Sequence, residues 1–177
     1  MGNKVVIRRS KSLKSKIGLL TWLPALIMMV IIFRFSTANG DQSSALSSNL
    51  TNRLVNTAAA IMKIELTPEQ KLSIEDSIHT PIRKLGHMTE YGLLGIAAAF
   101  ALYIYHKKRG WNLFLWCEGI CVLYACTDEF HQLFVPERSG QLMDVLIDSI
   151  GITLGLGFFY VVLLCRKKNK EKSPDFR

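Results

Sequence analysis

Ionisable side chains recur at helical spacing inside sequence that is otherwise apolar. The segment RKLGHMTEYG places Arg83, His87, Glu90 and Tyr91 at i, i+4, i+7 and i+8, with Lys84 beside the first of them. Residues at this spacing share one face of a helix. Ionisable side chains within a membrane are costly and mark a functional site by default. This face is therefore the first part of a candidate site.

A second polar face lies in the segment TDEFHQLFVPERSG. Asp128, His131 and Gln132 are spaced i, i+3 and i+4, and Glu129 points about a quarter turn away from them. The short connection that follows carries Arg138. The spacing predicts that Asp128, His131 and Gln132 act together on one helix face.

A third polar face opens the last apolar segment. Asp144 and Asp148 are spaced i, i+4, and Gly151 and Gly155 continue the same stripe. Small residues four apart allow two helix backbones to approach closely. The stripe therefore predicts a close helix contact next to two carboxylates.

One hypothesis for the chemistry is recognition of an anionic group. Arg83, Lys84 and Arg138 could clamp a phosphate or a carboxylate, because guanidinium groups form bidentate hydrogen bonds with both. Imidazole, phenol and amide groups of the same faces would supply further hydrogen bonds. Binding of a lipid-linked wall precursor or a lipid-tailed glycopeptide would need no catalysis.

Two other chemistries use the same side chains. The carboxylates and imidazoles could serve a lipid hydrolase or phosphoryl transferase as an acid–base pair or a metal site. No nucleophile motif stands out, and the sequence specifies neither a metal-ligand set nor a cofactor. A small carrier could use the acidic pairs with Glu118, and its four spans would call for a homo-oligomer. Finally, the polar faces could serve only to assemble the helices.

The composition indicates one membrane domain with basic tails. Its 177 residues, 49% of them hydrophobic, suffice for one compact domain. Much of the formal net charge of +8 lies in residues 1–16 and 166–177, directly beside apolar sequence. Membrane topology and anionic lipid headgroups select charge in this position. No folded basic surface is indicated, so we expect no nucleic-acid partner.

Four apolar segments are long enough to cross a bilayer, which takes about 20 helical residues. Their approximate bounds are 17–35, 85–105, 113–134 and 142–165. Pro24 predicts a kink in the first segment. That segment is long for a signal peptide and lacks a small-residue cleavage site, so we expect a retained span. The predicted fold is an all-α membrane protein with four transmembrane helices in residues 17–165.

Basic residues predict the orientation of these spans. Each tail carries six and the loop 107–109 carries three, whereas 37–82 carries three against five acids. We therefore predict a multi-pass protein of the bacterial cell membrane with both termini in the cytoplasm. The outer loop 37–82 and the connection near Pro136 would face outside. In this topology the three polar faces lie in the outer part of the membrane.

Residues 37–82 also carry helix signals. An amphipathic helix is predicted by apolar residues that recur at helical spacing, namely Leu46, Leu50, Leu54 and Ile61. Thr67-Pro68-Glu69-Gln70 predicts a capping box that starts a second short helix, which we expect to end before Thr80-Pro81. Both helices should lie on the outer membrane surface or cover the bundle.

The cysteines do not indicate a disulfide or zinc framework. All four lie in apolar runs, and none forms a CxxC pair. We expect them to be small buried hydrophobic residues.

Three blocks of the sequence resemble the VanZ-like family, which is named for a teicoplanin-resistance determinant of Gram-positive bacteria. They are FSTANGDQS at 35–43, RKLGHMTEYGLLG at 83–95 and DEFHQLFVPERSGQLMDVLIDSIG at 128–151. Gln42 comes later after Phe35-Ser36 than the family pattern has it. Pro136-Glu137-Arg138 replaces the Pro-Gly-Arg of many relatives.

The resemblance implies four spans and an effect on susceptibility to glycopeptide antibiotics, teicoplanin in particular. It implies no reaction, because the family name records a phenotype. The partners expected from it are membrane lipids, together with a lipid-linked wall precursor or the lipoglycopeptide itself.

Overall fold

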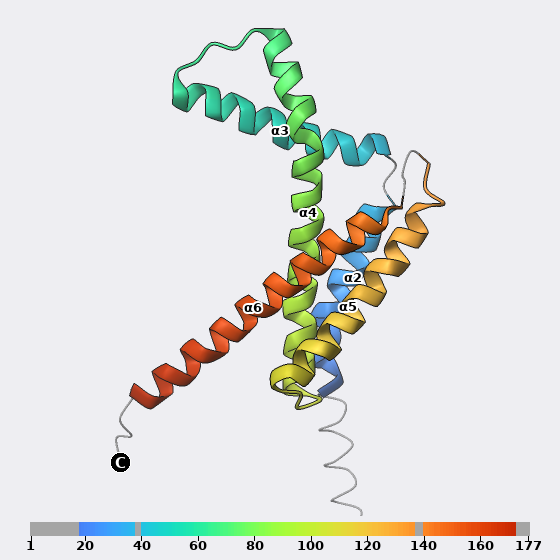
Figure 1. The fold of residues 1–177 in the computed structure, drawn as a ribbon, viewed down its shortest axis with the longest axis vertical. Coiled ribbons are helices and arrows are strands. Elements are labelled where there is room, and N and C mark those ends of the chain that lie inside the picture. Colours follow the sequence, from blue (N-terminus) through green and yellow to red (C-terminus); the bar gives the residue numbers. More distant parts are fainter. Residues whose placement is uncertain (1–17, 38–39, 137–139, 173–177) are drawn as a thin grey trace, which may run out of the picture.

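The structure of the protein, a computed structural model, consists of helices joined by short loops in the residues that it describes. These are 18–37, 40–136 and 140–172, so the candidate residue Arg138 and the whole N-terminal tail 1–16 lie outside them. The elements in chain order are η1 Leu20–Trp22, α2 Leu23–Ser36, α3 Gly40–Met62, α4 Pro68–Ile104, α5 Gly110–Gln132 and α6 Leu142–Lys172 (Figure 1). The predicted all-α class is confirmed, and the described part contains no strand.

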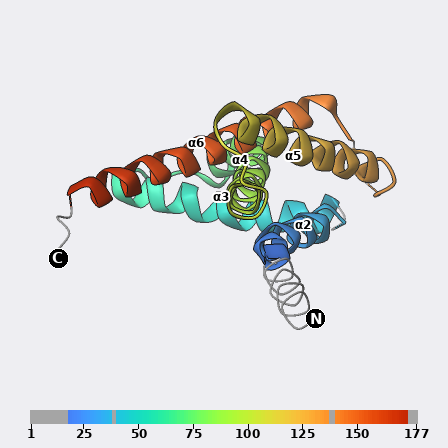
Figure 2. The same cartoon turned by 90° about the horizontal axis from the view of Figure 1, so that it is seen from below.

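Helix α4 is the axis around which the other helices are arranged. It contacts η1, α2, α3, α5 and α6, and the view along it shows α2, α5 and α6 on different sides (Figure 2). It begins with the predicted capping box: the Gln70 N–H donates to Thr67 Oγ1 at 3.3 Å, and the Thr67 N–H donates to Gln70 Oε1 at 3.0 Å. This reciprocal cap satisfies two backbone donors at the helix start.

The predicted helix end before Thr80-Pro81 is wrong. Helix α4 runs without interruption through Pro81 and has 37 residues in total. The second outer helix and the second apolar segment therefore form one element. A proline inside a helix removes one backbone hydrogen bond and costs about 3 kcal/mol. Its fixed φ is nevertheless helical, and Pro81 is exposed on the helix. Contacts of α4 with α3 and with the bundle outweigh this local cost.

The helical run that starts at residue 18 changes to a 3₁₀ turn just before Pro24, and the predicted kink itself stays a prediction. Pro24 lies in the first turn of α2, directly after the 3₁₀ turn Leu20–Trp22. Proline is favoured at this position, where its missing N–H would have no helical partner.

Helix α3 lies across α4 rather than along it (Figure 1). It ends where Lys63 adopts a left-handed φ of 54°, and the Ile64 N–H donates to Ala59 O at 3.0 Å. This arrangement closes a helix C-terminus and redirects the chain. The predicted amphipathic helix is therefore present, although its 23 residues make it longer than the short helix expected.

The apolar stripe of α3 does not pack inside the protein. Thr51 and Val55 are buried, whereas Leu50, Leu54 and Ile61 are exposed. The buried face of α3 and its exposed leucine stripe are roughly a third of a turn apart at 100° per residue. A helix that lies in a membrane surface and touches an upright helix sideways has this division of faces.

Helices α4 and α6 cross at glycines, where their backbones meet directly. A Cβ placed on Gly151 would collide with the Met88 carbonyl oxygen, and one on Gly155 would collide with that of Gly92. A Cβ on Gly95 would lie 3.0 Å from the Ile152 carbonyl oxygen. The glycine stripe on α6 thus permits the close approach predicted for it.

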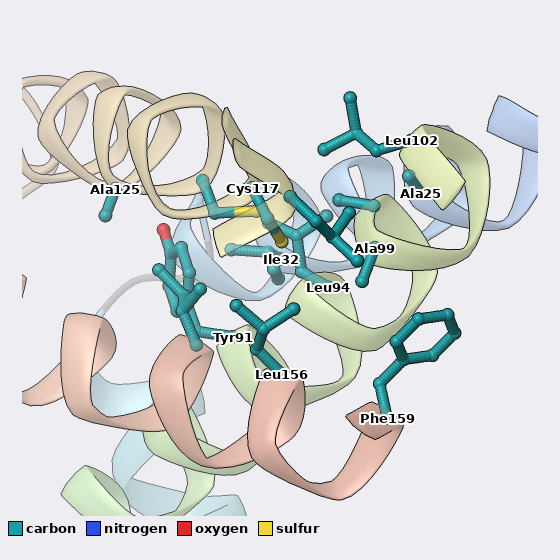
Figure 3. Packing of buried hydrophobic residues seen from close by; sticks show 14 of the residues in the cluster. Ala25, Ile32, Tyr91, Leu94, Ala99, Leu102, Cys117, Ala125, Leu156 and Phe159 are labelled. Atoms are coloured by element: carbon teal, nitrogen blue, oxygen red, sulfur yellow. The ribbon is translucent and has the colours of Figure 1, made fainter. Parts of the chain in front are cut away.

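The polarity of the bundle is the reverse of that in a water-soluble protein. Its outward surface is rich in exposed large apolar side chains, including Leu26, Val30, Leu123 and Phe158. The interior combines an apolar cluster (Figure 3) with buried Ser36, Asp128, Glu129, Gln132 and Asp148. By length and composition, Pro68–Ile104 and Leu142–Asn169 could each cross a membrane, and Leu20–Ser36 is a shorter apolar helix. These apolar helices suggest a membrane protein.

The cysteine prediction is correct in part. Cys117 and Cys121 are buried in the apolar cluster, whereas Cys126 and Cys165 are exposed, and all four are free thiols. The exposed pair lies on the outward faces of α5 and α6, which are apolar as well.

The glycine crossing yields a prediction in which the direction of the effect depends on position. Gly151→Ala and Gly155→Ala should lower the thermal unfolding midpoint in detergent, because overpacking of a tight contact costs about 1–3 kcal/mol. Gly157→Ala is the control, since its Cβ would meet nothing within 4 Å. That variant should be neutral or stabilised, because alanine is favoured over glycine in helices by about 1 kcal/mol. The midpoints are measured by circular dichroism. Equal midpoints for all three variants would contradict a tight contact between α4 and α6 at Gly151 and Gly155.

Candidate functional site

The structure brings side chains of all three predicted polar faces together where α4, α5 and α6 meet. Tyr91 is 0% exposed, Asp148 is 1% and Asp128 is 3%. Glu129 and Gln132 are buried beside them. These five residues are named the buried cluster below.

Gln132 joins the buried cluster to α2. Its Nε2 donates to Ser36 Oγ at 2.9 Å and lies 3.3 Å from Glu129 Oε1 and 3.4 Å from Asp128 Oδ2. One amide thus orients two carboxylates and holds the end of α2 against the end of α5. Sequence analysis did not single out Ser36, although it lies in the first of the family-like blocks.

Glu129 has a positioning role that the quarter-turn offset in the sequence did not reveal. Its Oε2 accepts a hydrogen bond from the Gln141 N–H at 2.9 Å, which ties the connection before α6 to the last turn of α5. A Cβ on Gly140 would collide with the Glu129 carbonyl oxygen, so only glycine fits here. This attachment determines where α6, with Asp144 and Asp148, starts.

The floor of the site consists of polar atoms that lack hydrogen-bond partners within the described part of the chain. They are both carboxylate oxygens of Asp148, and beside them the Tyr91 hydroxyl faces the Asp128 carboxylate. The Tyr91 side chain comes from α4 and points its hydroxyl toward α5, on the side of Ala125 (Figure 3). A buried polar group without a partner costs about 1–3 kcal/mol, more if it is charged. Such groups are rare in proteins and need a specific explanation.

The electrostatic surroundings of Asp148 are acidic. The carboxylates of Glu129, Asp128, Asp144 and Glu90 all act on it. Like charges repel strongly where water is excluded, because the local dielectric is low. A group that donates hydrogen bonds or carries positive charge would reduce this repulsion.

A cationic rim borders this acidic floor. Lys84 Nζ of α4 lies 3.2 Å from Asp144 Oδ1 of α6, and both side chains are partly exposed. Arg83, which directly precedes Lys84 in α4, is also half-buried. The sequence predicted a basic clamp, and the structure places one member of it, Lys84, at the edge of the site beside Asp144.

The two histidines lie at the margin of the site. The ring of His131 packs in a tilted arrangement against Phe33 of α2, with the ring centroids 4.8 Å apart, so it holds α5 against α2. His87 and Glu90 are half-buried on α4. No group of three or more His, Cys, Asp and Glu residues among 18–37, 40–136 and 140–172 is arranged to hold a metal ion.

The arrangement can perform recognition in two layers. Donor groups of a ligand would meet the unpaired oxygens of Asp148, and an anionic group would meet the rim at Lys84 and Arg83. Hydrogen bonds to ionised groups are about twice as strong as neutral ones.

Comparison with known proteins gives a match to one family model over most of the chain. A family model described as VanZ/LLP1 matches residues 21–164. The match covers η1, α2 to α5 and the greater part of α6. No curated protein and no solved structure matches the chain.

The unpaired carboxylate of Asp148 predicts a trade-off between stability and function. Asp148→Asn should raise the thermal unfolding midpoint, because an amide can donate to the neighbouring carboxylates whereas a carboxylate repels them. Proteins keep destabilising polar groups of this kind at functional sites.

Asp144→Asn is the matched comparison, because it weakens the ion pair with Lys84 and should leave the midpoint unchanged or slightly lower. Thermal melts of both variants in one detergent test the difference. A midpoint of Asp148→Asn below that of the parent would show that the carboxylate stabilises the fold.

Proposed function

Because the chain belongs to the VanZ/LLP1 family, we propose that it lowers the susceptibility of a Gram-positive bacterium to teicoplanin-type glycopeptides. The family suggests a membrane protein linked to glycopeptide resistance. The proposal adds a mechanism: the site binds a lipid-linked molecule of the cell envelope at the outer leaflet.

The architecture proposed for this role has four membrane-spanning helices. Besides α4 and α6, α2 is apolar and α5 has 23 residues, long enough to cross a bilayer core. Three acids reduce the apolar character of α5: Glu118, Asp128 and Glu129. Two of these belong to the buried cluster, so the site itself makes this span polar. The exposed side chains Leu115, Leu123 and Phe130 of α5 would face lipid.

The orientation proposed places the basic end of the bundle in the cytoplasm. The loop Lys107-Lys108-Arg109 and the end of α6 with Arg166 lie at one end of the molecule (Figure 1). Trp22 Nε1 donates to His106 Nε2 at 3.2 Å, so the start of α2 is at this end too. Basic residues remain on the cytoplasmic side of membranes. The buried cluster and α3 would then be on the outer side.

Asp148 carries the proposal for ligand binding, since a nearly fully buried carboxylate has both oxygens unpaired. Sugar hydroxyls and amide N–H groups of a wall precursor are donors that suit Asp148, Asp128 and Tyr91. The phosphate of the same molecule suits Lys84 and Arg83. A simple anion clamp would need only the rim, whereas a phosphorylated, sugar-bearing headgroup uses both layers.

The proposed topology is tested by labelling with a membrane-impermeant maleimide. Glu65→Cys, made in a Cys126→Ser/Cys165→Ser background, should react from outside intact cells because Glu65 is an exposed charged residue in the connection between α3 and α4. Lys108→Cys in the same background should react only after the cells are opened. The reverse pattern would invert the orientation, and reaction of both in intact cells would contradict the four-span topology.

The proposed function is tested by teicoplanin inhibition of a susceptible Gram-positive host at matched membrane levels of each variant. The parent should raise the inhibitory concentration, and Asp148→Asn and Asp128→Asn should return it to the level of the empty host. Glu118→Gln is the control, because Glu118 lies outside the buried cluster and its Oε1 accepts a hydrogen bond from Thr153 at 3.2 Å.

Each other outcome has a defined meaning. No effect of the parent would overturn the resistance role. Full activity of Asp148→Asn would remove the buried cluster from the function. Loss of activity in Glu118→Gln would favour a carrier. Titration of the purified protein with wall precursor and with teicoplanin then distinguishes the two ligands.

A further inference from the structure

A groove on the opposite half of the bundle is not used by the function proposed above. Beyond the glycine crossing, α6 diverges from α4 (Figures 1 and 2), and the wedge between them forms a groove of about 470 Å³. Pro24 of α2 closes one side of it. The groove thus lies between three helices, toward the end of the bundle with the basic loop.

The walls of this groove are apolar and open sideways. Leu93 and Phe100 of α4 face Phe158 of α6 across it, and all three are exposed. In a bilayer such a wedge faces acyl chains, because both helices contribute only apolar side chains at this depth. Arg166 is the charged residue of the lining, and it lies at the end of the apolar part of α6.

A basic pocket continues the groove toward the membrane surface. It has a volume of about 570 Å³ and is lined by Arg109, Arg166 and Lys167. Tyr103, Leu163 and Arg166 line both cavities, so the two are adjacent. An apolar trough therefore leads to a mouth with three cations.

The mouth is held in shape by contacts that do not use up its charge. Arg109 stacks on Tyr103, with its guanidinium carbon 3.4 Å from the ring centroid, and donates to Tyr103 O at 2.6 Å. The Tyr160 hydroxyl donates to Gly110 O at 2.6 Å and ties α6 to the start of α5. The partners of Arg109 are a ring and carbonyl oxygens, so its positive charge is not neutralised.

We propose that this groove binds an anionic phospholipid of the leaflet at the basic end of the bundle. One acyl chain lies in the apolar trough, and the phosphate lies between Arg166, Lys167 and Arg109. Basic pockets between transmembrane helices select anionic headgroups in this way. The proposal requires insertion into the membrane but is independent of the buried cluster and of any effect on teicoplanin.

Charge favours a lipid over a second copy of the chain as the occupant. Copies inserted in the same direction would bring Lys107, Lys108 and Arg166 of one protomer beside the same cations of the other. Like charges at the same depth repel. A phospholipid supplies the apolar chain and the negative charge together.

The proposal is tested by native mass spectrometry of the full-length protein released from detergent with phosphatidylglycerol or phosphatidylcholine. The parent should retain phosphatidylglycerol in preference to phosphatidylcholine. Arg166→Gln/Lys167→Gln should reduce this preference by about fivefold for each cation, the effect of one basic residue near an anionic headgroup. Lys107→Gln/Lys168→Gln removes the same charge from the same end without altering the lining and should behave like the parent.

If both double variants lost the preference for phosphatidylglycerol equally, general surface charge would explain the preference. The proposed lipid site would then be wrong. Absence of a preference in the parent would overturn it as well. Helix content by circular dichroism confirms that the variants fold. If Arg166→Gln/Lys167→Gln fails to fold, brominated phosphatidylglycerol in parent nanodiscs replaces it. Bromine density in the groove would support the site, and density spread evenly around the bundle would contradict it.

Discussion

The close crossing of α4 and α6 is the constraint on which the rest of the structure depends. Gly92, Gly151 and Gly155 let the two backbones touch, and no larger residue would fit at the two glycines of α6. On one side of the crossing, Tyr91 and Lys84 of α4 meet Asp148 and Asp144 of α6. On the other side the helices diverge and leave the apolar groove with its basic mouth. One contact between glycines thus separates a buried polar cluster from an apolar groove.

The buried carboxylates destabilise the fold, and the apolar exterior increases this free-energy cost. In water an unpaired aspartate can be hydrated, but Asp148 is nearly inaccessible and the surrounding helices present hydrocarbon to the outside. The cost of several unpaired polar atoms must be recovered from packing, and the crossing and the apolar cluster supply that packing. A chain selected only for stability would replace Asp148 with an apolar or amide residue. Its presence points to a ligand that satisfies it.

Helical periodicity was sufficient to predict most of the site, and long-range contacts account for what it missed. The spacing of Asp128, Gln132 and Asp148 predicts shared faces, because a helix face is a local property. Ser36 could not be found in this way, since its contact with Gln132 spans 96 residues of sequence. Pro81 was misjudged for the same reason: its local preference for a break is outweighed by packing of α4 on both sides. The helical class, the capping box and the glycine stripe were local features and were predicted correctly.

The division of charge within the site narrows the chemistry that it can serve. The sequence alone suggested a basic clamp for an anion, but Lys84 is already paired with Asp144 at the edge, and the interior is acidic. An anion drawn inward would meet Asp148 and Asp128 and be repelled. A ligand with a phosphate and several hydroxyl or amide donors avoids this conflict, because its charge stays at the rim while its donors reach the floor. In the binding mode proposed above, the rim would select the leaflet and the depth, and the buried oxygens would distinguish a sugar-bearing headgroup from an ordinary phospholipid.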